Sequence, residues 1–237
     1  MTIGPDARAL QAVAARALDL VEDGATVGLG SGHAAATFIA QLGKRVRQGL
    51  RVVAVPTSEA STRQARDAGI PLIELGEAEL DLTVDGADEV APNLDLVKGR
   101  GGALVRERIV ASASRRQVIL VGQDKVVHAL GEHGFIPVEL IPLARDPATR
   151  HLRTLGLRPT IRADPTNARP LITENHNLTI DCALVEPLRD GRAARELEAA
   201  LLAIPGVVDT GLFLGTAERV LVGYPDGRVD VLGPRSS

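Results

Sequence analysis

Residues 25–43, with the sequence ATVGLGSGHAAATFIAQLG, decide the fold class of this chain. The first apolar residues indicate a short strand, Gly28, Gly30 and Gly32 indicate a tight turn, and the alanine-rich stretch after them indicates a helix. A strand that runs through a glycine turn directly into a helix is typical of the crossover units of parallel sheets. The segment therefore favours an α/β fold.

The alternation continues on both sides of this segment. Further strands are expected at 51–58, 70–75, 80–88 and 116–122, and helices at 1–20, 59–69 and 103–113. Together they predict a Rossmann-like, mostly parallel sheet with helices on both faces. The segment 218–232 is expected to return to this sheet as its final strand, so the predicted catalytic domain comprises residues 1–130 and 215–237.

The pattern changes after Gly131. Strands are expected at 135–142, 158–163 and 207–214, a hairpin at 170–185, and helices at 147–155 and 193–203. This order is β-α-β-β-α-β with at most one extra strand. It predicts a smaller ferredoxin-like α+β domain over residues 131–214.

Composition disfavours several classes of protein. No apolar stretch approaches the ~18 residues that span a bilayer, and the N-terminus lacks the apolar block of a signal peptide. The net charge of −3 and the small number of aromatic residues disfavour nucleic-acid binding. The single cysteine, Cys182, excludes an internal disulfide and fits a buried position in a protein of the reducing cytoplasm. We therefore expect a cytoplasmic protein with neither membrane nor nucleic acid as a partner.

Three loops of the larger predicted domain carry residues suited to chemistry. The first comprises Ser31, Gly32, His33 and Ala34, at the expected start of a helix. Backbone amides at a helix N-terminus suit a small phosphate. A dinucleotide fits poorly because His33 stands where the third glycine of the dinucleotide fingerprint belongs. A tight turn without a ligand is the alternative.

The second loop comprises Asp85, Gly86, Ala87, Asp88 and Glu89, directly after an apolar strand. Two acids three residues apart can point into one cavity, or can simply cap a turn. No histidine or cysteine lies nearby to complete a transition-metal site, so no metal is predicted. Spacing alone leaves magnesium bound through carboxylates open.

The third loop contains Lys98, Gly99, Arg100 and Gly101 and leads into a helix that carries Glu107. Of the 27 lysines and arginines only three are lysines, so each one suggests a position that needs a compact ammonium. Taken alone, Glu107 could be a solvated helix residue. Since parallel strands present their loops at one edge of the sheet, the three loops together supply carboxylates beside an ammonium. This combination suits proton transfer at a carbon next to a carbonyl.

Several stretches closely resemble the ribose-5-phosphate isomerase type A family, over nearly the whole chain. They are VPTSEASTRQARDAGIPL (55–72), DLTVDGADEV (81–90), LVKGRGGALVRERIVAS (96–112), FIPVELIP (135–142) and IPGVVDTGLF (204–213). The resemblance implies a cofactor-free isomerisation between ribose 5-phosphate and ribulose 5-phosphate in the pentose phosphate pathway. It also implies a small-molecule sugar phosphate as ligand and a homodimer or dimer of dimers.

The resemblance assigns roles at matching positions. Glu107 would be the base that moves a proton between C1 and C2 through an enediolate. Asp85 and Asp88 would hold and relay protons to the sugar oxygens, and Lys98 with the amides of its loop would stabilise the oxyanion. Lys125 matches a substrate-binding lysine of the family.

The phosphate end of the site departs from the family pattern. Where the family usually reads GTGST, residues 30–34 read GSGHA, and Arg100 interrupts the glycine run after Lys98. A lysine common near the family's N-terminus is absent, and the turn at 174–177 reads ENHN where the family usually reads DNGN. An isomerase for a different aldose and a non-catalytic sugar-phosphate-binding protein are therefore the alternatives.

Overall fold

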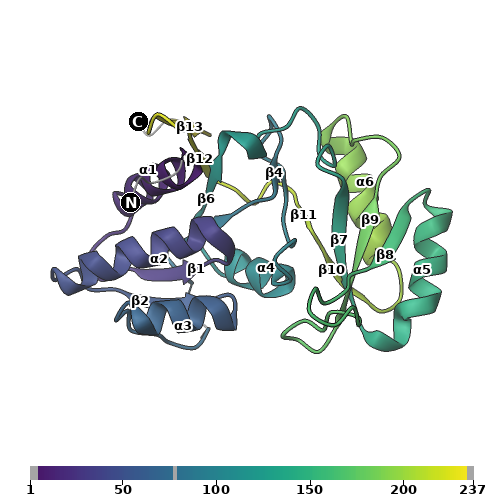
Figure 1. The fold of residues 1–237 in the computed structure, drawn as a ribbon, viewed down its shortest axis with the longest axis horizontal. Helices are drawn as coiled ribbons and strands as arrows, with labels where there is room; N and C mark the ends of the chain where they lie inside the picture. Colours follow the sequence, from purple (N-terminus) through teal and green to yellow (C-terminus); the bar gives the residue numbers. More distant parts are fainter. Residues whose placement is uncertain (1–4, 77–78, 234–237) are drawn as a thin grey trace. The chain divides into compact units, whose positions relative to one another are not determined.

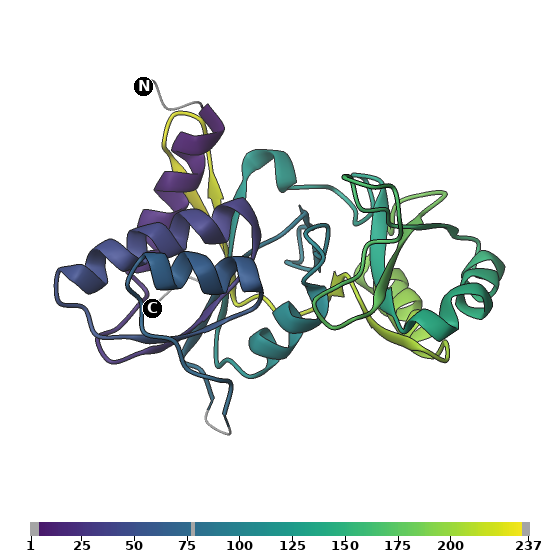
Figure 2. The same ribbon diagram turned by 60° about the horizontal axis from the view of Figure 1, so that its bottom comes forward.

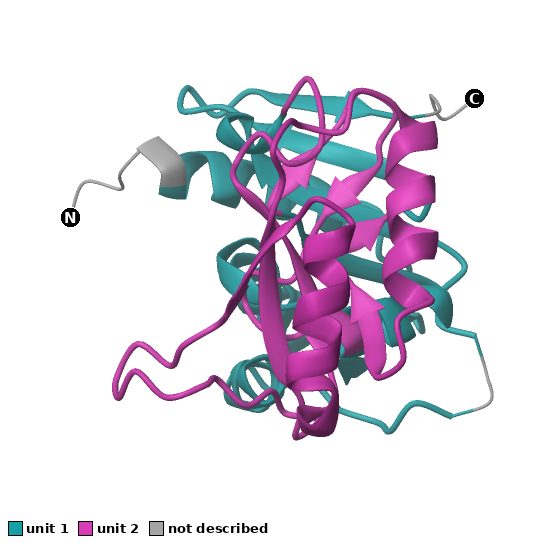
Figure 3. Cartoon of the chain, turned by 90° about the vertical axis from the view of Figure 1, so that its right-hand side faces the viewer, with its two compact units in different colours: residues 1–87, 106–126, 215–237 teal, residues 88–105, 127–214 magenta. Residues whose placement is uncertain are grey.

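The computed structural model describes residues 5–76 and 79–233. The start of the expected N-terminal helix, residues 1–4, lies outside the described residues. The chain forms two compact units, which Figure 3 colours separately. Residues 1–87, 106–126 and 215–237 form the first unit, and residues 88–105 and 127–214 form the second.

A six-stranded sheet forms the framework of the first unit (Figure 1). Its strands lie in the order β13-β12-β6-β3-β1-β2, and every neighbouring pair is parallel except β12 with β13. The strands are β1 (Thr26–Leu29), β2 (Val53–Pro56), β3 (Leu82–Gly86), β6 (Gln117–Gly122), β12 (Arg219–Gly223) and β13 (Val229–Leu232). The predicted, mostly parallel sheet is therefore confirmed. The segment 218–232 joins it as a hairpin and not as one strand.

Helices cover both faces of this sheet. They are α1 (Pro5–Leu18), α2 (Gly32–Arg47), α3 (Glu59–Asp67) and α4 (Leu104–Ser112). Helices α1, α2 and α3 share one buried core with Val27 and Leu29 of β1, and α2 lies beside α3 (Figure 2). Successive strand residues point to opposite faces, and a Cβ at Gly28 would lie 2.7 Å from Cγ1 of Val110 in α4. Glycine at position 28 thus lets α4 pack closely on the other face.

The expected strand at 70–75 does not form, which corrects the sequence prediction. The segment instead makes an isolated bridge between Ala54 and Leu72, with the amide of Ile73 donating to Ala54 O over 3.0 Å. Pro71 has no N–H to donate, so the segment cannot extend a regular ladder of hydrogen bonds beside β2.

The second unit contains a four-stranded antiparallel sheet in the order β10-β7-β9-β8. Its elements are β7 (Phe135–Leu140), the 3₁₀ helix η2 (Pro142–Ala144), α5 (Arg145–Thr154), β8 (Arg158–Ile161), β9 (Leu178–Ala183), α6 (Gly191–Leu202) and β10 (Val207–Thr210). Both α-helices pack against the sheet around a common core. The β-α-β-β-α-β order of a ferredoxin-like fold is therefore confirmed.

Cys182 lies fully buried in β9 of this sheet, as predicted. Burial, with the neighbouring charge of Asp181 as a second cause, raises the pKa of the Cys182 thiol to about 12. The thiol is therefore protonated and shielded at neutral pH, which fits a packing role.

A small three-stranded sheet, β11-β5-β4, was not predicted. Its strands are β4 (Glu89–Val90), β5 (Leu96–Val97) and β11 (Leu212–Phe213). The segment 207–214, expected as one strand, is divided at Gly211 between β10 and β11. The Gly211 amide still bonds Pro137 O in β7, the partner of β10, whereas the Gly211 carbonyl accepts from the Lys98 amide, next to β5. Strands of two residues are too short to show a sequence period.

Candidate active site

The loops after β1, β2 and β3 meet at the carboxyl edge of the parallel sheet. Strand β1 lies between β2 and β3 in the sheet, so β2 is added on one side of β1 and β3 on the other. The direction in which successive strands are added therefore reverses between β1 and β3. In open α/β sheets, ligands bind at such a switch point, outside the carboxyl ends of the strands. Ser31 follows β1 and Asp85 lies near the end of β3, so two of the predicted site residues stand there.

Asp85 is fully buried and is held by backbone amides. Its Oδ1 accepts hydrogen bonds from the Ser31 amide at 3.1 Å and from the Gly86 amide at 2.7 Å. Gly30 packs directly on this carboxylate, since a Cβ at that position would lie 2.0 Å from Oδ1. The glycine turn and the first acid of the DGAD motif therefore form one structure.

Three hydroxyl groups gather beside this turn. Ser31 Oγ lies 2.9 Å from Thr57 Oγ1 and donates to Ser58 Oγ at 2.8 Å. Thr57 Oγ1 in turn donates to Leu29 O at 3.1 Å, and Ser58 caps α3 through reciprocal bonds with Ser61. Thr57 and Ser58 are buried, so they orient the Ser31 hydroxyl. Sequence reasoning missed both residues, although they directly follow β2, the strand beside β1.

The first turn of α2 supplies amides next to Ser31. Gly32 has φ of +88°, a left-handed conformation that favours glycine. The amides of Gly32, His33 and Ala34 stand at the positive end of the helix dipole, and the side chain of His33 is exposed. This turn is suited to receive an anion.

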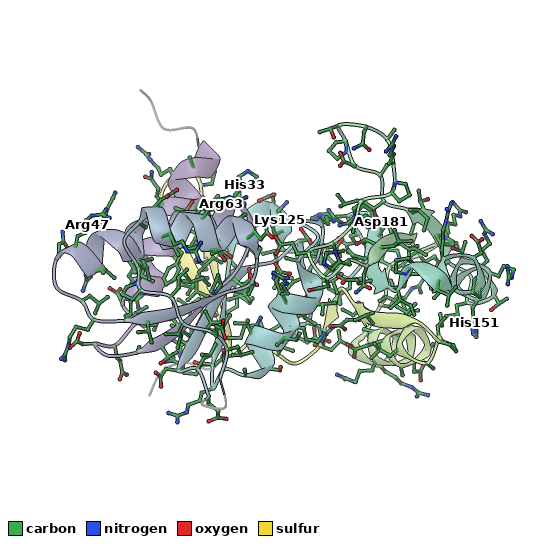
Figure 4. All side chains as sticks on the ribbon, turned by 90° about the horizontal axis from the view of Figure 1, so that it is seen from below. His33, Arg47, Arg63, Lys125, His151 and Asp181 are labelled. Atoms are coloured by element: carbon green, nitrogen blue, oxygen red, sulfur yellow. The ribbon has the colours of Figure 1, made fainter. Side chains whose placement is uncertain are left out.

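Lys125 ends the short 3₁₀ helix η1 (Gln123–Lys125), which follows β6 at the same edge of the sheet. Its Nζ lies 3.2 Å from Asp124 Oδ2, and its side chain is 39% exposed. An exposed ion pair contributes only about 0–1 kcal/mol, so this ammonium can turn to an anionic ligand at little cost. Figure 4 labels both His33 and Lys125.

Glu107 lies in the first turn of α4 and is 5% exposed. Carboxylates are almost never buried to this degree unless they are paired or have a function. The sequence alternative, a solvated helix residue, is therefore wrong.

Asp88 and Lys98 belong to one small region of the second unit. Asp88 Oδ2 accepts a hydrogen bond from the Arg100 amide at 3.0 Å. Lys98 is 2% exposed, its amide donates to Gly211 O at 2.8 Å, and its ammonium lies 5.5 Å from the centre of the Phe213 ring. The aromatic face provides cation–π attraction to this buried charge.

The side chain of Arg100 bonds residues outside the loop to which its backbone belongs. Its Nη2 donates to Glu89 Oε1 at 3.3 Å and to His133 O at 2.8 Å, and its guanidinium lies 4.8 Å from the centre of the Phe135 ring. Glu89 is fully buried and also accepts from the amides of Gly131 and His133. The sequence placed Glu89 in the second loop, but no role for it was predicted. The role of Arg100 in binding substrate stays a prediction.

The chemistry that these groups offer is proton transfer. A carboxylate such as Glu107 can accept a proton, and the Lys98 ammonium can stabilise negative charge on an oxygen. Asp85 and Asp88 can accept hydrogen bonds from hydroxyl groups. Within residues 5–76 and 79–233, no three His, Cys, Asp or Glu side chains are grouped so as to hold a metal ion. In the same part of the chain, no helix has the length and apolar character needed to cross a membrane.

Comparisons with known proteins agree with this chemistry. A family model described as ribose 5-phosphate isomerase A (phosphoriboisomerase A) matches residues 53–227. The chain is 47% identical over 231 residues to ribose-5-phosphate isomerase A of Gloeobacter violaceus, covering 96% of each chain. It is 44% identical over 225 residues to the protein of that name from Deinococcus radiodurans, covering 94% of this chain and 97% of the relative.

Solved structures give the same result. Ribose 5-phosphate isomerase A from Methanocaldococcus jannaschii superposes with a TM-score of 0.88 at 41% identity, covering 95% of this chain and 98% of that one. A D-ribose-5-phosphate isomerase in complex with phospho-erythronic acid superposes with a TM-score of 0.91 at 34% identity, covering 97% and 99%. Fold and sequence thus point to one family.

Proposed function

The chain belongs to the ribose-5-phosphate isomerase A family, and from this premise we propose how its residues carry out the reaction. It is an aldose–ketose isomerase that interconverts ribose 5-phosphate and ribulose 5-phosphate. The observation that carries this conclusion is the likeness over almost the entire chain. Asp85, Asp88, Lys98 and Glu107 all lie within residues 53–227, the stretch that the family model matches.

Glu107 is the proposed base. It removes the proton from C2 of the open-chain aldose and returns it to C1, so that a cis-enediolate forms between the two steps. Its burial supports this role, because a base shielded from water returns its proton to the substrate and does not exchange it with solvent.

Lys98 is the proposed stabiliser of the enediolate. A compact ammonium at 2% exposure acts in a region of low dielectric, where its charge counts for more than it would in water. Asp85 and Asp88 hold the sugar hydroxyls and relay protons between the sugar oxygens during ring opening and during the transfer, so that the proton of the C2 hydroxyl reaches the C1 oxygen. The loop residues Gly86, Ala87, Gly99, Arg100 and Gly101 are proposed to contact the sugar.

The phosphate is proposed to bind at the first turn of α2. The amides of Gly32, His33 and Ala34, the Ser31 hydroxyl, the His33 imidazole and the ammonium of Lys125 supply donors. The hydroxyls of Thr57 and Ser58 support this proposal, because they hold Ser31 Oγ beside these amides, and its O–H, which bonds Ser58 Oγ here, can rotate toward a phosphate.

The setting of the reaction follows as further proposals. The enzyme acts in the non-oxidative pentose phosphate pathway of the cytoplasm, without metal or organic cofactor, as a homodimer or a dimer of dimers. Its catalytic domain comprises residues 1–130 and 215–237, and its small domain comprises residues 131–214. The fold order supports a boundary near residue 131, because the β-α-β-β-α-β run begins at β7, whereas the compact units place residues 88–105 and 127–130 in the second unit.

A coupled assay of the purified protein tests the function. We expect conversion of ribose 5-phosphate to ribulose 5-phosphate that is unchanged by exhaustive chelation. Unphosphorylated ribose and other aldose phosphates serve as comparison substrates. Equal or better turnover of an unphosphorylated sugar would favour an isomerase for a different aldose. This is the rival function, because residues 30–34 depart from the family pattern. Recovery of chelated enzyme only on addition of magnesium would show that the acids are metal ligands.

A further inference from the structure

Arg162, directly after β8, reaches the loop that carries Lys98. Its Nη1 donates to Gly99 O at 2.8 Å and to Arg100 O at 3.0 Å. Its Nε donates to Asp181 Oδ2 at 3.0 Å, and its Nη2 bonds Asp181 Oδ1. The side chains of Arg162 and Asp181 are 11% and 19% exposed. One guanidinium therefore links a carboxylate of β9, labelled in Figure 4, to two consecutive carbonyls of the loop.

These bonds set the direction of two amides. A trans peptide holds its C=O and N–H antiparallel, and no cis peptide occurs in the described chain, 5–76 and 79–233. Because the carbonyls of Gly99 and Arg100 turn toward Arg162, the N–H groups of Arg100 and Gly101 point the opposite way. The Arg100 N–H accordingly meets Asp88 Oδ2 at 3.0 Å.

The loop needs such an anchor. Gly99 has φ of +99°, and a Cβ there would lie 2.8 Å from Cβ of Leu104, so no side chain at position 99 can restrict the backbone. A charged donor on each carbonyl also polarises the peptide and makes its N–H a stronger donor. The guanidinium thus both aims and strengthens the two amides.

We propose that Arg162 and Asp181 are a positioning pair for the isomerase reaction, which aims the Arg100 amide at Asp88 and the Gly101 amide at the negative oxygen of the enediolate. The proposal rests on the proposed function. The pair acts through the loop and does not touch the sugar. Its removal is therefore expected to lower kcat more than it raises KM.

The test uses the full-length enzyme and the variant Arg162→Lys, with Arg158→Lys as its control. Lysine keeps the charge but cannot bond the carboxylate and both carbonyls together. Arg158 is exposed at the start of β8, the strand that Arg162 directly follows. Loss of one charge-assisted contact corresponds to a fall of about tenfold to a hundredfold, and we expect this fall in kcat for Arg162→Lys alone.

Two binding measurements separate positioning from general damage. Phospho-erythronic acid carries a planar carboxylate that resembles the enediolate, whereas inorganic phosphate probes the phosphate site alone. We expect Arg162→Lys to weaken inhibition by phospho-erythronic acid in parallel with kcat and to leave inhibition by inorganic phosphate unchanged. Labelling of the buried thiol of Cys182, beside Asp181 in β9, should stay as slow as in the wild type if the unit remains folded.

A double-mutant cycle with Asp181→Asn completes the test. If both residues act through one contact, the double variant should lose no more activity than the worse single variant, whereas independent effects multiply. Near-normal kcat in Arg162→Lys would overturn the proposal, and so would equal weakening of both inhibitors or rapid Cys182 labelling. The kcat of each variant is divided by that of the wild type, with whichever sugar the wild type converts best. If that sugar is not ribose 5-phosphate, the proposed function is wrong, but the effect of Arg162→Lys can still be measured.

Discussion

The two units hold their functional loops by different means. In the first unit, the turn after β1 is held by groups that stand at the ends of neighbouring parallel strands. Asp85 lies near the end of β3 and accepts the Ser31 amide, while Thr57 and Ser58 follow β2 and bond the Ser31 hydroxyl. In the second unit, buried and half-buried carboxylates gather donors from segments that are distant in the sequence.

Three carboxylates of the second unit work in this way. Glu89 accepts the amides of Gly131 and His133, and Asp181 holds Arg162 against the Lys98 loop. Fully buried Glu139 gathers the turn 173–177, because its Oε1 accepts from Thr173 Oγ1, Asn175 Nδ2 and Asn177 Nδ2 at 3.0, 3.1 and 2.9 Å. The contacts at the strand ends follow from the topology of a parallel sheet. Each carboxylate anchor depends instead on the particular residues that surround it.

The largest effect is expected at the proposed base, Glu107, in the first unit. Glu107→Gln keeps the shape of the side chain and removes its basicity, so kcat should fall by about 10²–10⁴-fold. KM and the fold should change little. Steady-state kinetics against Glu196→Gln, a change on the exposed face of α6, checks this expectation. A Glu107→Gln enzyme that retains more than about a third of wild-type kcat would sink the assignment.

The next effect tests the ammonium of the second unit. Lys98→Ala should lower kcat by about 10²–10³-fold, and Lys98→Arg should be nearly as damaging because a planar guanidinium does not fit a buried site shaped for a compact ammonium. Lys44→Arg, on the exposed surface of α2, is the matched control. Near-normal turnover of Lys98→Arg would show that the loop needs only a positive charge.

The phosphate end of the first unit should respond in KM. Lys125→Ala and His33→Ala each remove one donor, and a charge-assisted hydrogen bond is equivalent to about tenfold to a hundredfold in binding. We expect KM for ribose 5-phosphate to rise by up to this factor while kcat is largely kept. Arg47→Ala, at the far end of α2, is the control. A fall in kcat with constant KM would place these residues at the chemistry instead.

The difference between strand-end contacts and carboxylate anchors also explains which site residues could be predicted from the sequence. The glycine turn at 28–32 and the DGAD motif predicted the parallel sheet and the edge where Ser31 and Asp85 meet, because strand ends converge by topology. Glu89, Arg162 and Asp181 could not be found in this way. Arg162 and its partner Gly99, for example, lie 63 residues apart in the sequence, and no local periodicity encodes such a contact. The apolar pattern at 70–75 likewise predicted a strand that does not form, because Pro71 has no N–H to donate.

The smallest expected effect concerns the turn that Glu139 anchors. His176 is exposed and has φ of +62°, a left-handed conformation, at the position where the family usually has glycine. The left-handed region costs an L-residue about 1–2 kcal/mol, while glycine costs about 0.5–1 kcal/mol in backbone entropy. His176→Gly should therefore be slightly stabilising, by up to about 1 kcal/mol, or about 2–4 °C in Tm.

Branching at Cβ provides the contrasting variant. Valine tolerates positive φ worst, so His176→Val should be destabilised relative to the wild type, and Tm should fall in the order Gly, His, Val. Thermal unfolding of the three proteins measures this order. Activity should be equal in all three, because the Glu139 anchor is made by Thr173, Asn175 and Asn177 and not by position 176. If His176→Val unfolds at or above the wild-type Tm, the carboxylate anchor does not hold the turn in its left-handed form, and the contrast between the two units fails at this turn.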